Sequence, residues 1–188
     1  ATFSVAAPGA IVVAIQPQAT LDPRMTEWDD RFTEMRRVSF TDRYGYAPDM
    51  IDAAEHAYIL YDPHQQLDAM HAALFARENV TRLRLPCMGE AIQTRLIEMD
   101  LLYRFISLAG SRRLTPHAFH RLVRARRHNP VYLRNVLTRL EFQDRPYLTM
   151  LLCRNVNERL RMPRFRRRMQ NLEARADGGE FRAPPPRS

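Results

Sequence analysis

Cysteine is scarce in this chain of 188 residues, which contains two, Cys87 and Cys153. Both lie in apolar sequence, and neither has the Cys or His spacing of a zinc site or of a disulfide framework. No set of carboxylates completes a ligand group around the histidines. We therefore expect two buried thiols in a reducing compartment, the cytoplasm, and no metal or other cofactor.

Long apolar runs are also missing. An uncharged stretch at residues 5–21 contains Pro8, Gly9 and Gln16, so it cannot supply the ~20 apolar residues of a membrane span. It also lacks the basic start of a signal peptide. Because apolar residues make up 45% of the sequence, the chain is long enough for one proper core with a helical appendage. We expect no membrane span.

Lysine is absent, and all 29 basic residues are arginine. They are distributed unevenly. Residues 1–110 contain 10 arginines and 15 acidic residues, a net charge of −5, whereas residues 111–188 contain 19 arginines and 6 acidic residues, a net charge of +13. The sequence therefore divides into an acidic first part and a basic second part, which should differ in the charge of the partners they attract.

The first part alternates strands with helices. Short β-branched runs at 10–15, 57–61 and 80–85 are typical of strands buried on both faces of a parallel sheet, and helices are predicted at 48–57 and 67–78. This alternation predicts an α/β fold with a partial parallel sheet and right-handed crossovers. The loops 16–22, 62–68 and 86–90 leave the carboxyl ends of the strands, so they should converge and bring Asp68 and Glu90 to one edge.

The second part is helical. Thr115 and Asn129 each precede a proline and are typical N-caps, and further helices are predicted at 145–160 and 163–176. The Gly-Gly and Pro-Pro-Pro tail is expected to be disordered. We therefore predict a sheet region at 1–110, a small basic helical extension at 111–175 and a tail at 176–188.

Three segments in the first part together resemble a known family. The order "IVVAIQPQATLDP", "AYILYDPHQQLD", "VTRLRLPCMGE" is similar to the last three strands of an α/β-hydrolase, including bacterial hydrolase-like proteins. The resemblance covers residues 1–105, about half of the chain. It implies that Asp68, or less well Asp62, occupies the acid position after the seventh strand. It also implies that Glu90 stands after Gly89, where the family has its catalytic histidine.

The catalytic set that the resemblance implies is incomplete in this sequence. The nucleophile elbow G-x-S-x-G does not occur, and the resemblance places it upstream of Ala1. Ser4 lies in an expected helix rather than at a strained turn, and Glu90 can act as a base only if it is buried. We therefore predict a hydrolase-like protein, either a fragment of a hydrolase or a pseudoenzyme with a binding or scaffold role, that does not turn over simple acyl esters.

Several of these residues also have structural interpretations. Asp62 precedes Pro63 and can cap a helix, and Asp68 can do the same. His64 and His71 are seven residues apart, so they share a helix face if one helix holds both. Under this interpretation, the carboxylates and histidines stabilise the fold and carry no chemistry.

The arginines of the second part suggest an alternative function. The candidate anion-binding residues are Arg121, Arg124, Arg127, Arg166 and Arg167. Such a cluster can bind nucleic acid or another polyanion through phosphates, independently of sequence. The arginines can instead neutralise the acidic first part, within one molecule or between subunits, which leaves a homo-oligomer or an acidic protein partner open. We favour neutralisation, because the same helices carry an apolar stripe that must be buried.

Overall fold

The computed structural model describes residues 7–20 and 46–185. The chain forms two compact units, residues 1–126 and residues 127–188. Within the described ranges, no helix is both long and apolar enough to cross a membrane.

The first unit contains a parallel sheet of three strands in the order β1-β2-β3. They are β1 (Ala10–Ile15), β2 (Ala54–Tyr61) and β3 (Val80–Arg84). Ile15 pairs with Leu60, which in turn pairs with Leu83, so the strands end at one edge. The predicted parallel arrangement is confirmed. The consecutive residues Ile59 and Leu60 are both buried, which requires cover on both faces of the sheet.

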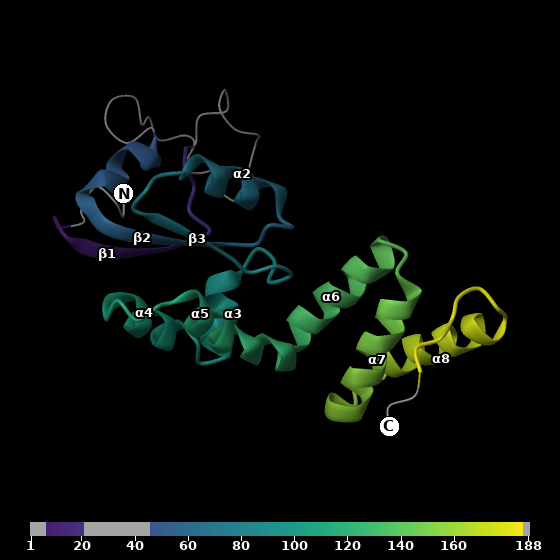
Figure 1. The fold of residues 1–188 in the computed structure, drawn as a ribbon. Coiled ribbons are helices and arrows are strands. Elements are labelled where there is room, and N and C mark those ends of the chain that lie inside the picture. The colour runs from purple at the N-terminus through teal and green to yellow at the C-terminus, as the bar shows by residue number, and fades with distance from the viewer. Residues whose placement is uncertain (1–6, 21–45, 186–188) are drawn as a thin grey trace. The chain divides into compact units, whose positions relative to one another are not determined.

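Helices provide that cover. The first unit contains the 3-10 helix η3 (Ala47–Ala53), α2 (Gln66–Leu74), α3 (Ile92–Glu98), α4 (Leu102–Gly110) and α5 (Pro116–Val123). A second 3-10 helix, η4 (Arg124–His128), lies at the junction of the units. Figure 1 shows α2 on one face of the sheet and α4 on the other. The fold of this unit is a mixed α/β layer structure.

The helix predicted at 48–57 is wrong in its second half. The helical turn η3 ends at Ala53, and Ala54 already pairs with Ala10 of β1. The pairing with β1 therefore overrides the local helical pattern, because it supplies the backbone hydrogen bonds that this segment needs. The sequence also gave no prediction of α3 or α4.

Two groups of buried side chains fix the layers. On one face, Ile51 of η3, Ile59 of β2 and Phe75 after α2 are fully buried in one cluster. Elsewhere in the unit, the ring of Phe105 on α4 makes edge contacts with Tyr58 of β2 and Phe119 of α5. Full burial of each large apolar side chain contributes about 1.5–3 kcal/mol to stability. The positions of the strand ends are therefore held by packing on both faces.

The second unit is helical, with α6 (Pro130–Phe142), α7 (Pro146–Leu160) and α8 (Pro163–Asp177). Each helix has proline in its first turn, where the missing N–H costs no helical hydrogen bond. The side chain of Asn129 accepts hydrogen bonds from the N–H groups of Val131 and Tyr132, both at 3.0 Å. In the first unit, Thr115 accepts from Ala118 at 3.1 Å. Both predicted N-caps are confirmed.

The three helices of the second unit enclose their own core, in which Leu137, Cys153 and Phe165 are buried. Residues after α8 also contribute, because Phe181 packs against this core. Arg154 of α7 donates hydrogen bonds to the carbonyl oxygens of residues 184 and 185, at 3.2 and 2.6 Å. The described part of the predicted tail thus returns along the helices.

Candidate functional site

The side chain of Gln16 joins the loops at the carboxyl edge of the sheet. Its amide nitrogen donates hydrogen bonds to the carboxylate of Asp68 and, at 3.1 Å, to the carbonyl oxygen of Gly89. Its amide oxygen accepts from the N–H of Ile92 at 2.9 Å. Its own N–H donates to the carbonyl oxygen of Leu60 at 2.8 Å. One residue therefore connects the end of β1 with β2, α2 and the loop between β3 and α3.

Asp62 is the second centre of this edge. Only 1% of the residue is exposed. One carboxylate oxygen accepts hydrogen bonds from the N–H groups of His64 at 2.9 Å and Cys87 at 3.2 Å, and the other accepts from the N–H of Gly89 at 2.8 Å. Hydrogen bonds to the charged form compensate for the lost hydration of a buried carboxylate. Asp62 therefore fixes the loop after β2 against the loop after β3.

The loop after β3 is a tight turn in which three successive N–H groups are engaged. Cys87 has φ of +65° and Gly89 has φ of +77°, both in the left-handed region. The N–H groups of Cys87 and Gly89 donate to Asp62, and the N–H of Met88 donates to the carbonyl oxygen of Leu85 at 3.4 Å. The backbone donors of this turn are therefore used within the fold.

The structure brings Asp68 and Glu90 to the same edge, as predicted. Gln16 bonds both to Asp68 and to Gly89, the residue before Glu90. Asp68 is buried, whereas Glu90 is exposed. The burial that Glu90 needs in order to act as a base is therefore absent. Ser4 and the end of the first loop, residues 21 and 22, lie outside the described residues.

Neither acid caps the helix that follows. Helix α2 begins after Gln65 and has no side-chain cap. Asp62 instead accepts a hydrogen bond from the backbone two residues ahead, which is the geometry of an Asx-turn. Asp68 lies inside the first turn of α2, where a negative charge is favourable at the helix N-terminus. The capping interpretation is wrong, although both acids do stabilise local structure.

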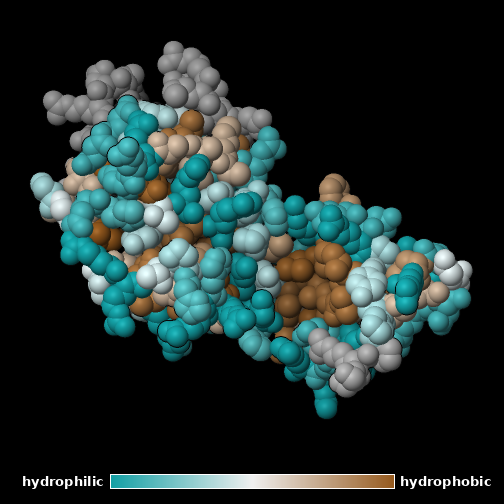
Figure 2. Space-filling model, viewed as in Figure 1, coloured by the Kyte–Doolittle hydropathy of each residue, from teal (hydrophilic) through white to brown (hydrophobic). Residues whose placement is uncertain are grey.

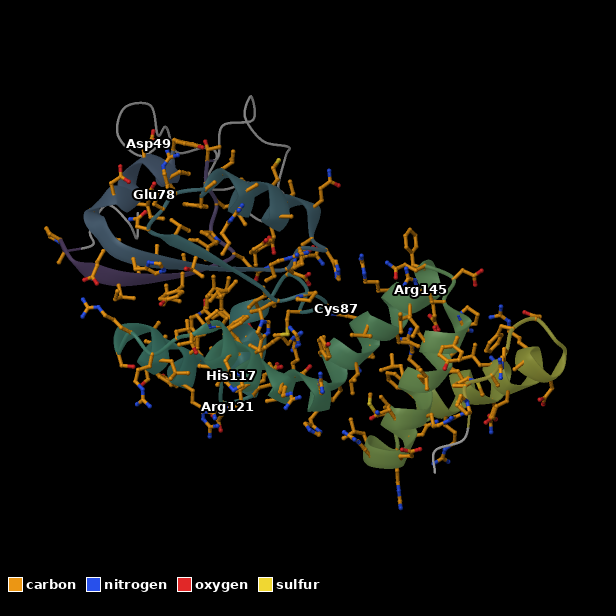
Figure 3. The ribbon with its side chains drawn as sticks, in the orientation of Figure 1. Asp49, Glu78, Cys87, His117, Arg121 and Arg145 are labelled. Atoms are coloured by element: carbon orange, nitrogen blue, oxygen red, sulfur yellow. The ribbon has the colours of Figure 1, made fainter. Side chains whose placement is uncertain are left out.

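A pair that the sequence analysis missed lies at this edge. The sulfur of Cys87 is 3.5 Å from Nδ1 of His64, and the same nitrogen is 3.8 Å from a carboxylate oxygen of Asp62. Figure 3 labels Cys87 after the end of β3. The thiol is partly exposed, so the expectation that both cysteines are buried holds for Cys153 and is wrong for Cys87. The sequence could have indicated this pair, because His64 and Cys87 lie in two loops that were predicted to converge.

The second histidine of this region, His71, is buried and stabilises the fold. Only 1% of His71 on α2 is exposed, and its Nδ1 accepts a hydrogen bond from the N–H of Ala19 at 3.2 Å. His64 precedes α2, so the two histidines are not on one helix. Within the described residues, no group of three His, Cys, Asp or Glu side chains could hold a metal ion.

All five candidate anion-binding arginines are exposed: Arg121, Arg124, Arg127, Arg166 and Arg167. Arg121 lies on α5, one turn after the exposed His117, and Figure 3 labels both. Arg166 and Arg167 lie on α8 in the second unit. The candidates are therefore divided between the two units.

Other arginines of the basic second part form ion pairs with acids. Arg112 donates two hydrogen bonds, at 2.9 and 2.5 Å, to the carboxylate of Glu55 on β2. This contact lowers the pKa of Glu55 below its ordinary value and raises that of Arg112. In the second unit, Arg168 lies 2.6 Å from Glu141 on α6. Neutralisation of acids is therefore one role of these arginines.

Comparisons with known proteins do not identify a relative. No family model, curated protein or solved structure matches this chain.

Proposed function

We propose that this chain is an α/β-hydrolase-like protein whose acids at the strand ends maintain a binding or scaffold surface rather than catalyse hydrolysis. The supporting observation is the engagement of the Asp62 carboxylate by three backbone N–H groups, including those of Cys87 and Gly89. The family named in this proposal rests on the resemblance of residues 1–105 to hydrolase strands.

Hydrolysis of an acyl bond needs three things at one place: an activated nucleophile, a base, and donors for the oxyanion. The turn after β3 follows a strand and precedes a helix, a position well suited to oxyanion donors. Its N–H groups at positions 87–89 are already bound to Asp62 and Leu85. Asp68 accepts the amide of Gln16, and Glu90 is exposed. These engagements favour a structural role for the predicted catalytic acids.

The test is steady-state hydrolysis of short-chain p-nitrophenyl esters by the 188-residue chain. We expect turnover no higher than that of a buffer blank, and no difference between the wild type, Asp68→Asn and Glu90→Gln. Turnover that Asp68→Asn abolishes would show that Asp68 is catalytic and would overturn the proposal. A burst of nitrophenol equal to the amount of protein, absent in Cys87→Ser, would show acylation of the Cys87 thiol and not turnover.

The alternative, binding of a polyanion, is favoured by one observation. Among the described residues, none of the five candidates forms an ion pair with an acid, whereas Arg77, Arg95, Arg112, Arg168 and Arg175 do. Exposed guanidinium groups of this kind bind phosphates by releasing counterions. The pairing of the other arginines with acids nevertheless favours neutralisation as the main role of the positive charge.

A further inference from the structure

We propose that Cys87 is a reactive thiol that His64 activates, and that it exchanges with small-molecule disulfides to form a mixed disulfide. The observation is the 3.5 Å contact between the sulfur of Cys87 and Nδ1 of His64 at the carboxyl edge of the sheet. This chemistry goes beyond the proposed binding or scaffold role and does not depend on it.

The contact is suited to proton transfer from the thiol to the imidazole. A thiolate is the nucleophilic form of cysteine, and a neighbouring protonated histidine stabilises it. Nδ1 of His64 also lies 3.8 Å from the buried carboxylate of Asp62, which stabilises an imidazolium. The three N–H groups that bind this carboxylate offset its negative charge and so limit its repulsion of the thiolate.

Asp62 also positions the pair. The same carboxylate oxygen accepts from the N–H of His64 and from the N–H of Cys87, residues that are 23 positions apart in the chain. This bridge holds the two loops in the register that places sulfur beside nitrogen. The thiol is partly exposed, so a small reagent can reach it.

The exchange step needs only the Cys87 thiol, the imidazole of His64 and the disulfide. Nδ1 of His64 takes the proton of the Cys87 thiol, and the thiolate attacks one sulfur of the disulfide. A bond forms between that sulfur and Cys87, while the original S–S bond breaks. The second sulfur leaves as a thiolate and takes up the proton from the imidazolium. The disulfide is the oxidant, and the displaced thiol is the reduced product.

Disulfide exchange fits this turn better than acyl transfer does. Attack on a carbonyl group creates an oxyanion that backbone donors must stabilise. The N–H groups of Cys87, Met88 and Gly89 are bound to Asp62 and Leu85. Thiol-disulfide exchange forms no oxyanion, so it does not need these donors.

The molecule also contains a matched control in the second unit. Cys153 is fully buried, and burial raises the pKa of its thiol to about 11. It should therefore react only when the protein unfolds. A native-state reaction that modifies one cysteine thus reports on Cys87.

Oxidised glutathione is the probe, with the full chain at pH 7 and the adduct located by intact mass and peptide mapping. We expect one adduct, at Cys87, formed about threefold faster than with a model thiol. If His64 raises the thiolate fraction about fifteenfold, from a few per cent to about half, the lower basicity of that thiolate removes about fivefold of the gain. We expect His64→Gln to lower the rate about threefold, while His117→Gln and Cys153→Ser leave it unchanged.

The dependence of the rate on pH separates activation from simple exposure. In the wild type, the rate should rise with a midpoint below that of an ordinary thiol, about 8.5, and His64→Gln should move the midpoint up to that value. Among the described residues, the carboxylate of Asp62 lies 3.8 Å from Nδ1 of His64, and Glu90 follows Cys87 by three positions on the same turn. A wild-type rate and midpoint equal to those of the model thiol would overturn the proposal, whether or not the variants fold.

Discussion

The carboxylate of Asp62, at the end of β2, accepts a hydrogen bond of 2.8 Å from the backbone N–H of Gly89, in the turn after β3. The two residues are 27 positions apart, and the bond ties neighbouring strand ends together. With the bonds from His64 and Cys87, it makes this buried acid the centre of the edge.

Asp62→Asn should destabilise the first unit by about 1–3 kcal/mol, because the new amide NH₂ group faces N–H donors that lose their acceptor. Asp52→Asn is a matched control on the exposed surface of η3 and should change stability by less than about 0.5 kcal/mol. Urea unfolding measures both. Equal stabilities for the two variants would contradict a central role for Asp62.

Gln16→Gly should also destabilise the first unit, by about 1–3 kcal/mol. Glycine suits the φ of +49° at this position, so the loss reports the missing amide rather than backbone strain. The N–H of Ile92 and the carboxylate of Asp68 each lose a partner. Gln93→Ala, on the exposed surface of α3, is the control and should have little effect. If both variants unfold at the same urea concentration, the amide of Gln16 does not support the edge.

Cys153 should make the stability of the second unit depend on pH in alkaline solution. Burial raises the pKa of its thiol from 9.0 to about 11. Between these values, the unfolded chain loses the proton while the folded chain keeps it, so stability should fall as pH rises from 9 to 11. Cys153→Ala should lack this part of the decrease, although it is less stable at neutral pH because of the cavity. Parallel stability curves for the two proteins in this range would contradict the prediction.

The Glu55–Arg112 ion pair should be visible in a titration of the carboxyl group. The hydrogen bonds from Arg112 hold the pKa of Glu55 below the ordinary 4.5, so the stabilisation is present above that pH and is lost as the pH falls through the lowered value. In an NMR titration, Arg112→Gln should return Glu55 to its ordinary range, and Arg113→Gln should not. Both groups are exposed, so the effect on stability should be small.

Charge reversal at Arg124 and Arg127 distinguishes the two roles of the arginines. Arg124 follows the last turn of α5, where a negative charge is unfavourable, so the double variant should melt at a lower temperature. We expect negligible binding of the wild type to duplex or single-stranded nucleic acid near physiological ionic strength. The polyanion function would be favoured instead by submicromolar binding of the wild type that weakens with salt. In that case the double variant should bind all sequences more weakly to the same extent, and its melting temperature should be unchanged. Arg166→Glu with Arg167→Glu repeats the test on α8.

The largest apolar surface in the view of Figure 2 covers part of the second unit. Exposed apolar side chains of α6 and α7 include Phe142, Tyr147 and Leu148, which are 90%, 41% and 39% exposed. These residues are not part of the apolar stripe from which the sequence predicted burial. That stripe is buried at Val123 and Leu137 and half-buried at its other three positions, Leu122, Val136 and Leu140. The sequence pattern identified the stripe, but it did not distinguish the positions that face the core of this unit.

The sequence by itself determined the features that depend on local chemistry. The β-branched runs predicted the parallel strands, and Thr115 and Asn129 before proline predicted two helix starts, because a cap and its helix are neighbours in the chain. The tertiary structure alone decided the end of η3 at Ala53, the burial of Asp62 and the exposure of Glu90. It also decided the contact between Cys87 and His64, since these residues meet only when two loops close on one carboxylate. Such contacts depend on how the strand ends pack, and the local pattern of residues does not predict that packing.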